Sequence, residues 1–233
     1  EWVARWPRWN DRIAAMGPAA ADRLAPRWQS RCRVVGDLMV DLSESARADQ
    51  PLPAGDWIAL MPGSKRAKLQ VGVPFLLETA DRLARQQPGC RFLLPVAPTT
   101  SVRELLAYSG PANPIAAAYS AGEAQLQNGP LGQELCTAAG TRILLVEQQP
   151  AHGVLSQCRL ALTTVGANTA ELGALGVPMI VLVPTQHLHV MQAWDGGLGI
   201  LARLPLLRWL LGAALTAWRM RHHGFLEIGR AHV

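Results

Sequence analysis

Two glycine-containing segments combine residue types that could bind an anion. The first is the run Pro62-Gly63-Ser64-Lys65-Arg66-Ala67-Lys68, which brings together a glycine, a hydroxyl group and three cations. In the second, Gly166 precedes a helix-length segment that contains Thr169 and Glu171. Glycine lets the backbone pass close to a ligand, and a helix N-terminus presents unpaired N–H groups and the positive end of its dipole. Both segments are therefore candidates for binding a phosphate or a diphosphate.

Each segment also has a simpler interpretation. The first is not a Walker A loop, because Ser64 stands between Gly63 and Lys65, and it could be an ordinary exposed basic loop. The second could be a purely structural strand–helix–strand unit. Glu171 could accept hydrogen bonds from ribose hydroxyls, or it could instead cap the start of its own helix together with Asn168.

Other candidate motifs are weaker. Residues 197–202 match a dinucleotide-binding pattern by letter, but they follow no predicted strand. His187 and His189 lack an obvious third ligand, so we predict no metal site. The four cysteines are scattered without a Cys-x-x-Cys pair, which is typical of free thiols in a reducing compartment.

The net charge of +5 favours anionic partners. Nucleic acid is not expected, because the sequence contains no zinc-finger spacing and no aromatic RNA-reading motif. With 49% hydrophobic and 17% charged residues, the composition indicates a folded chain with a large core.

The elements that would position the two segments alternate between strands and helices. We predict strands over residues 57–61, 91–96, 141–147, 160–164 and 179–183. Helices are predicted after the Gly63 loop, with Pro74 near the first turn, and over residues 151–157 and 167–175. A further helix should begin at Ser101, which has a capping-box pattern with Glu104. Residues 109–140 suggest loops and a weak helix.

This alternation predicts an α/β fold: a Rossmann-like parallel sheet with helices on both faces. Ligands of such sheets bind at the carboxyl ends of the strands. Since Gly63 and Gly166 each follow a predicted strand, we expect them to share one crevice.

The domain organisation is predicted as follows. Residues 1–42 are the remnant of an N-terminal domain and a hinge, residues 43–56 form a linker, and residues 57–226 form the Rossmann-like domain. Within that domain, the apolar residues 198–226 suggest core helices or, alternatively, a surface that lies against a membrane. Residues 227–233 are what a common sequencing-adapter read-through would encode, so we expect the natural sequence to stop near Leu226.

Several pieces, in order along the chain, resemble lipid-A-disaccharide synthase. Residues 34–41 are similar to its hinge segment, and residues 60–65 are similar to its Leu-Pro-Gly-Ser-Arg loop. Residues 88–97 match its next strand. Gly166, Thr169 and Glu171, followed by residues 176–181, resemble its Ser-Gly-Thr-x-Thr-Leu-Glu element and the strand behind it. The chain departs from this pattern at Lys65 in place of arginine, at Lys68 where an acidic residue is usual, and at Val165 in place of serine.

The resemblance implies a GT-B glycosyltransferase, a hexosyltransferase built from two Rossmann-like domains that uses neither a metal nor a cofactor. Such an enzyme moves a sugar from a UDP-sugar donor to a lipid-linked acceptor at the cytoplasmic face of the inner membrane, which implies a cytoplasmic protein with peripheral membrane contact. The matching donor-binding residues would be Gly63, Ser64, Lys65, Gly166 and Thr169 at the diphosphate and Glu171 at the ribose.

The family's catalytic base lies in the N-terminal domain, which is essentially missing here. We therefore expect this chain alone to bind the donor weakly and to transfer nothing. A UDP-sugar epimerase of the same fold and a non-catalytic module that binds nucleotide sugars are the alternatives.

Overall fold

The computed structural model describes residues 51–119 and 122–183, together with residues 13–15, 17, 18, 22, 26–36, 40 and 41. In the N-terminal part, β1 (Ile13–Ala15) pairs in parallel with β2 (Cys32–Val34), and α2 (Pro26–Gln29) precedes β2. The predictions for residues 187–189, 197–202, 198–226 and 227–233 lie outside the described residues.

A seven-stranded sheet forms the centre of the described domain, with the strand order β5-β6-β7-β4-β3-β8-β9. The strands β4, β3, β8 and β9 run parallel to one another, and β7 runs parallel to β4. The apolar residues of β3, β7 and β8 are buried in continuous runs, as expected for strands covered on both faces, whereas the edge strand β9 is only partly buried. The strands are β3 (Asp56–Met61), β4 (Cys90–Pro95), β5 (Gln125–Gly129), β6 (Gly132–Cys136), β7 (Arg142–Val146), β8 (Leu160–Thr164) and β9 (Met179–Leu182).

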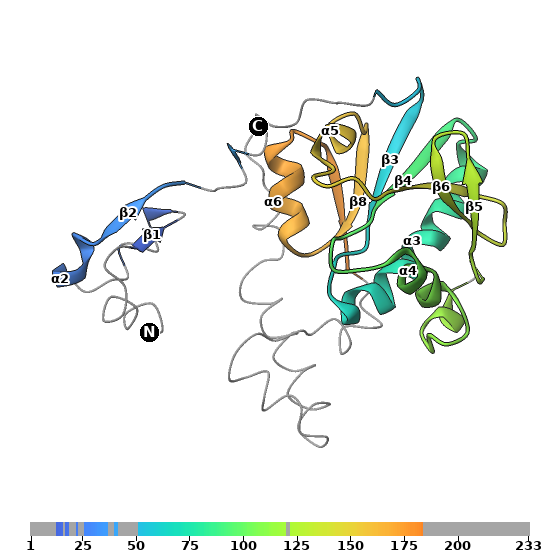
Figure 1. The fold of residues 1–233 in the computed structure, drawn as a ribbon, viewed down its shortest axis with the longest axis horizontal. Helices are drawn as coiled ribbons and strands as arrows, with labels where there is room; N and C mark the ends of the chain where they lie inside the picture. The colour runs from blue at the N-terminus through green and yellow to red at the C-terminus, as the bar shows by residue number, and fades with distance from the viewer. Residues whose placement is uncertain are drawn as a thin grey trace, which may run out of the picture.

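Helices cover both faces of this sheet (Figure 1). On one face, α3 (Arg66–Gln86) packs through Leu69, Leu76 and neighbouring apolar residues, and α4 (Val102–Ser109) packs through Leu105. On the other face lie α5 (His152–Leu155) and α6 (Ala167–Ala174), which contribute Leu155 and Leu172 to a second cluster. Alternate residues of β3, β4, β7 and β8 belong to the two clusters, because successive side chains point to opposite faces. The predicted Rossmann-like α/β fold is therefore confirmed.

The prediction that Pro74 lies near the start of its helix is wrong, because α3 begins at Arg66 and Pro74 lies inside it. A proline within a helix leaves the carbonyl four residues earlier without its N–H donor. Here Asn113 Nδ2 donates to that carbonyl, the oxygen of Gln70, at 2.7 Å. The partner comes from a distant loop, so the helix pattern alone could not reveal it.

The prediction of loops and a weak helix over residues 109–140 is also incomplete. The short helix η3 (Ala116–Ala118) is present, but β5 and β6 form an antiparallel hairpin that pairs with β7, so the sheet is mixed and not wholly parallel. β5 is an edge strand and is largely exposed. It therefore carries polar residues in place of the apolar alternation that predicts a strand.

Candidate anion site at the carboxyl ends of β3 and β8

The two glycine-containing segments lie next to each other. The strands before them, β3 and β8, are neighbours in parallel register, with Met61 opposite Thr163. Gly63 follows β3 with φ of +101°, a left-handed conformation that favours glycine, and Gly166 is the N-cap of α6. The hydroxyl of Thr164 donates to the carbonyl of Pro62 at 3.1 Å, which ties the two strand ends together. Both segments therefore leave the sheet at the same place.

The side chain of Lys68 occupies the space between the two glycines. Its Nζ donates to the carbonyl of Val165 at 2.6 Å. A Cβ on Gly63 would lie 3.1 Å from Lys68 Cδ, and a Cβ on Gly166 would lie 2.6 Å from Lys68 Nζ. The absence of side chains at both glycines thus makes room for an amine that α3 contributes.

The electrostatics of this corner favour a negative ligand. The N-termini of α3 and α6 both lie here, and neither helix has an acidic residue in its first turn. Three cations, Lys65, Arg66 and Lys68, lie at the start of α3, and Arg66 is 3.5 Å from Glu104. Cations near a helix N-terminus oppose the helix dipole. A bound anion would relieve this repulsion and accept hydrogen bonds from the helix-end N–H groups.

A cavity of about 200 Å³ opens beside this corner, and part of the predicted site lines it. Gly63, Ser64 and Glu171 contribute to its wall, and Asn168 and Gln149 do so as well. The other three predicted residues lie next to the cavity without lining it. They are Lys65, the exposed N-cap of α3; Gly166; and Thr169, whose hydroxyl donates to the Gly166 carbonyl at 2.8 Å.

Glu171 does not cap its own helix. The N-cap of α6 makes no side-chain hydrogen bond, and the carboxylate oxygen Oε1 of Glu171 lies 3.2 Å from Nε2 of His152. His152 belongs to α5 and is buried. Sequence reasoning missed His152 as a site residue, since nothing local links it to Glu171. Lys68 was one of the three cations of the predicted anion-binding run, but it was not among the donor-binding residues that the resemblance implied.

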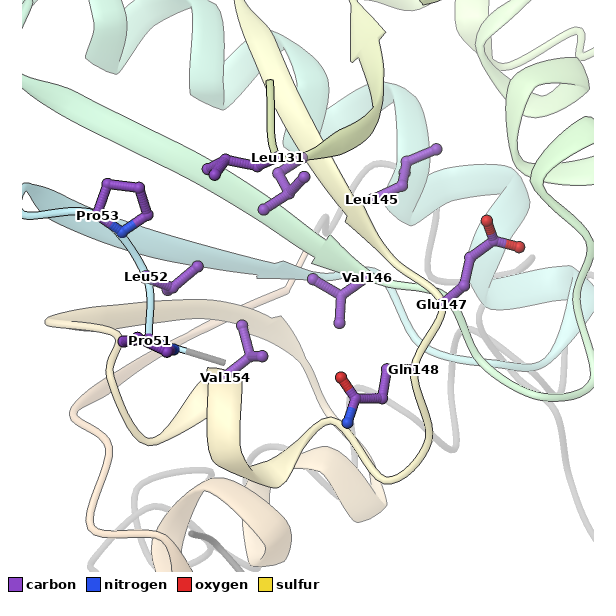
Figure 2. A pocket seen from close by; sticks show the side chains of 10 residues that line it. Pro51, Leu52, Pro53, Leu131, Leu145, Val146, Glu147, Gln148 and Val154 are labelled. Atoms are coloured by element: carbon purple, nitrogen blue, oxygen red, sulfur yellow. The ribbon is translucent and has the colours of Figure 1, made fainter. Parts of the chain in front are cut away.

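A second cavity, of about 240 Å³, lies on the same face of the sheet near the end of β7 (Figure 2). Most of the residues that line it have apolar side chains, and they come from the segment before β3, the hairpin turn, β7 and α5. Among the described residues that line it, Glu147 is the one charged side chain, and it is acidic. This second cavity is therefore unsuited to an anion. The lining residues are Pro51, Leu52, Pro53, Leu131, Leu144, Leu145, Val146, Glu147, Gln148 and Val154.

Two features are absent from the part of the chain that the structure describes. Within it, His, Cys, Asp and Glu side chains nowhere gather in a group of three or more that could hold a metal ion. None of its helices combines the length and apolar character needed to cross a bilayer.

Comparison with curated proteins identifies lipid-A-disaccharide synthases. The chain is 22% identical over 170 residues to the enzyme of Geobacter metallireducens, an alignment that covers 73% of this chain and 34% of that protein. It is 30% identical over 140 residues to the enzyme of Anaeromyxobacter dehalogenans, and this alignment covers 60% of this chain and 30% of that protein. A segment of 53 residues is 43% identical to the Pseudomonas fluorescens enzyme, and it covers 23% of this chain and 14% of that protein. The alignments thus span about a third or less of these relatives' length.

Two solved structures are similar in part. One is a proposed UDP-N-acetylglucosamine 2-epimerase from Listeria monocytogenes, with 18% identity and a TM-score of 0.47 over 76% of this chain and 43% of that chain. The other is Staphylococcus aureus MnaA with UDP, with 16% identity and a TM-score of 0.47 over 74% and 43%. No protein-family model matches the chain. The chain is thus similar in sequence to part of the lipid-A-disaccharide synthases, and the resemblance seen in its motifs is confirmed.

Proposed function

We propose that this chain is the donor-binding part of a glycosyltransferase that resembles lipid-A-disaccharide synthase. The observation that carries the proposal is the meeting of two helix N-termini and the Lys68 amine at neighbouring strand ends. A diphosphate fits this arrangement, because it accepts hydrogen bonds from backbone N–H groups and pairs with cations. In the proposed site, Gly63, Ser64, Lys65, Gly166 and Thr169 surround the diphosphate, Lys68 adds a cation, and Glu171 binds the ribose.

The proposed reaction moves a sugar from a UDP-sugar to a hydroxyl of a lipid-linked acceptor. The bond between the sugar's anomeric carbon and the diphosphate breaks, and a bond from that carbon to the acceptor oxygen forms. The hydroxyl proton passes to a general base, which the resemblance places in an N-terminal domain. The role of this chain is to stabilise the negative charge on the leaving UDP with cations and helix-end N–H groups, without a divalent ion. We expect the chain alone to bind donor without transferring sugar.

Isothermal titration of the chain with UDP tests the binding step. Lys68→Met removes the amine at the site, whereas Arg85→Met removes an exposed cation from the last turn of the same helix. A hydrogen bond to a charged group contributes about 1.5–3 kcal/mol, so we expect Lys68→Met to weaken UDP binding by about 10- to 100-fold. Arg85→Met should bind UDP as the unmodified chain does. An absence of UDP binding, or equal losses in both variants, would refute the proposal.

The chemical step needs a separate assay on a protein that also contains the N-terminal domain. Incubation with a UDP-sugar and a lipid-linked acceptor should yield glycosylated lipid and free UDP. Epimerisation of the UDP-sugar without any transfer would instead identify a UDP-sugar epimerase. Binding of the donor with neither reaction would indicate a non-catalytic module. Co-sedimentation of the same protein with anionic vesicles tests the proposed membrane contact.

A further inference from the structure

His152 is a buried polar side chain whose hydrogen-bonding capacity is only partly used. The residue is 6% exposed and lies in α5, against the face of the sheet that also carries α6. Its Nε2 is 3.2 Å from Oε1 of Glu171, whereas its Nδ1 is buried with no hydrogen-bond partner. Buried polar atoms usually have partners, so an exception often reflects a functional role for the group.

The contact with Glu171 restricts the state of the imidazole ring. A nitrogen that faces a carboxylate oxygen must carry the proton, so Nε2 is the donor. In the neutral ring Nδ1 is then a bare acceptor. The contact therefore places a proton on Nε2 and leaves Nδ1 without a partner.

Glu171 connects His152 with the cavity, which His152 itself does not line. The Glu171 side chain is 24% exposed and lines the cavity with Gly63 and Ser64. Within the described residues, His152 is the one polar partner recorded for its carboxylate, and it lies at Oε1. The second oxygen can therefore accept a hydrogen bond from a ligand in the cavity while His152 fixes the orientation of the group.

We propose that His152 is a positioning residue, which holds the Glu171 carboxylate so that it accepts hydrogen bonds from the ribose hydroxyls of a bound nucleotide. This inference rests on the proposed function, because it assumes that a nucleotide occupies the cavity. It adds a basis for specificity: the His152–Glu171 pair selects ribonucleotides over deoxyribonucleotides. A site built to bind a hydroxyl rejects the analogue that lacks it, since its own buried polar groups are then left unpaired.

The test compares the affinities of UDP and 2′-deoxy-UDP by isothermal titration of the full chain. We expect UDP to bind at least about tenfold more tightly than 2′-deoxy-UDP, a ratio that corresponds to about 1.4 kcal/mol. His152→Leu removes the donor and should reduce this ratio towards one. His152→Gln keeps an N–H donor of similar reach and should retain most of the ratio. Lys68→Met should weaken the binding of UDP and of 2′-deoxy-UDP by the same factor, so the ratio of the two affinities should not change.

Each result decides the inference. Equal binding of UDP and 2′-deoxy-UDP by the unmodified chain would overturn it while leaving the proposed diphosphate site intact. An unchanged ratio in His152→Leu would also overturn it, whereas the absence of binding to either ligand would overturn the proposed function itself. If His152→Leu does not fold by circular dichroism, the ¹⁵N shifts of His152 in the unmodified chain give the answer. A proton on Nε2 and a resonance that moves more with UDP than with 2′-deoxy-UDP are expected, and a proton on Nδ1 would refute the contact.

Discussion

Replacing Gly72 by alanine tests how closely α3 packs against the loop that precedes the candidate site. A Cβ on Gly72 would lie 2.9 Å from the carbonyl oxygen and 3.1 Å from Cα of Pro62, both backbone atoms that cannot rotate away. Alanine in place of glycine inside a helix normally stabilises it by about 1 kcal/mol. Overpacking a filled site costs about 1–3 kcal/mol. We therefore expect Gly72→Ala to lower the free energy of unfolding by up to about 2 kcal/mol.

Gly173→Ala is the matched control. Gly173 also lies in a helix, α6, but a Cβ there would meet no atom within 4 Å, so only the gain in helix propensity of about 0.5–1 kcal/mol should appear. Urea denaturation followed by far-UV circular dichroism measures both free energies. The same chemical change should thus have opposite signs in the two helices. If Gly72→Ala stabilises the protein as much as Gly173→Ala does, the close approach of α3 to Pro62 is wrong.

Three other predictions concern residues outside the site. Burial raises the pKa of the Cys158 thiol from its ordinary value of 9.0 to about 12. The neutral thiol therefore stabilises the folded state below pH 9, and this contribution to stability is lost as the pH rises towards 12. The free energy of unfolding should fall by about 1.4 kcal/mol per pH unit in this range, which urea denaturation at several pH values can measure. An equally steep fall in the Cys158→Ala variant would show that Cys158 is not the group responsible. Ser101→Ala removes the side-chain cap of α4 and should cost about 1 kcal/mol in the same denaturation assay, so a neutral result would show that the cap does not stabilise the helix. Asn113→Leu leaves the Gln70 carbonyl without a donor and should lower the free energy of unfolding by about 1–3 kcal/mol. Adding Pro74→Ala to this variant should recover part of the loss, because it restores a backbone N–H that can donate to Gln70. No recovery would argue against the hydrogen bond between Asn113 and Gln70.

Much of the fold could be predicted from local patterns. The five parallel strands and the helices α4, α5 and α6 lie within two residues of their predicted positions, because buried strands and helix starts depend on neighbouring residues. Ser101 accepts from the Glu104 N–H at 3.2 Å, as the capping pattern indicated. The β5–β6 hairpin was missed because β5 is an exposed edge strand and β6 contains the polar residues Gln133 and Glu134. Neither strand therefore has the apolar alternation on which such predictions depend.

The candidate site, too, could be predicted from the sequence only in part. The amino-acid sequence by itself determined that Gly63 and Gly166 would each lie between a strand and the helix that follows it, since glycine conformation and hydrophobic periodicity are local properties. Only the tertiary structure decided that these strands are neighbours, that Lys68 lies between the two glycines and that His152 faces Glu171. These relations depend on strand order and on side-chain packing between segments that are distant along the chain. No local pattern encodes such contacts, because they arise only when the whole sheet and its covering helices come together.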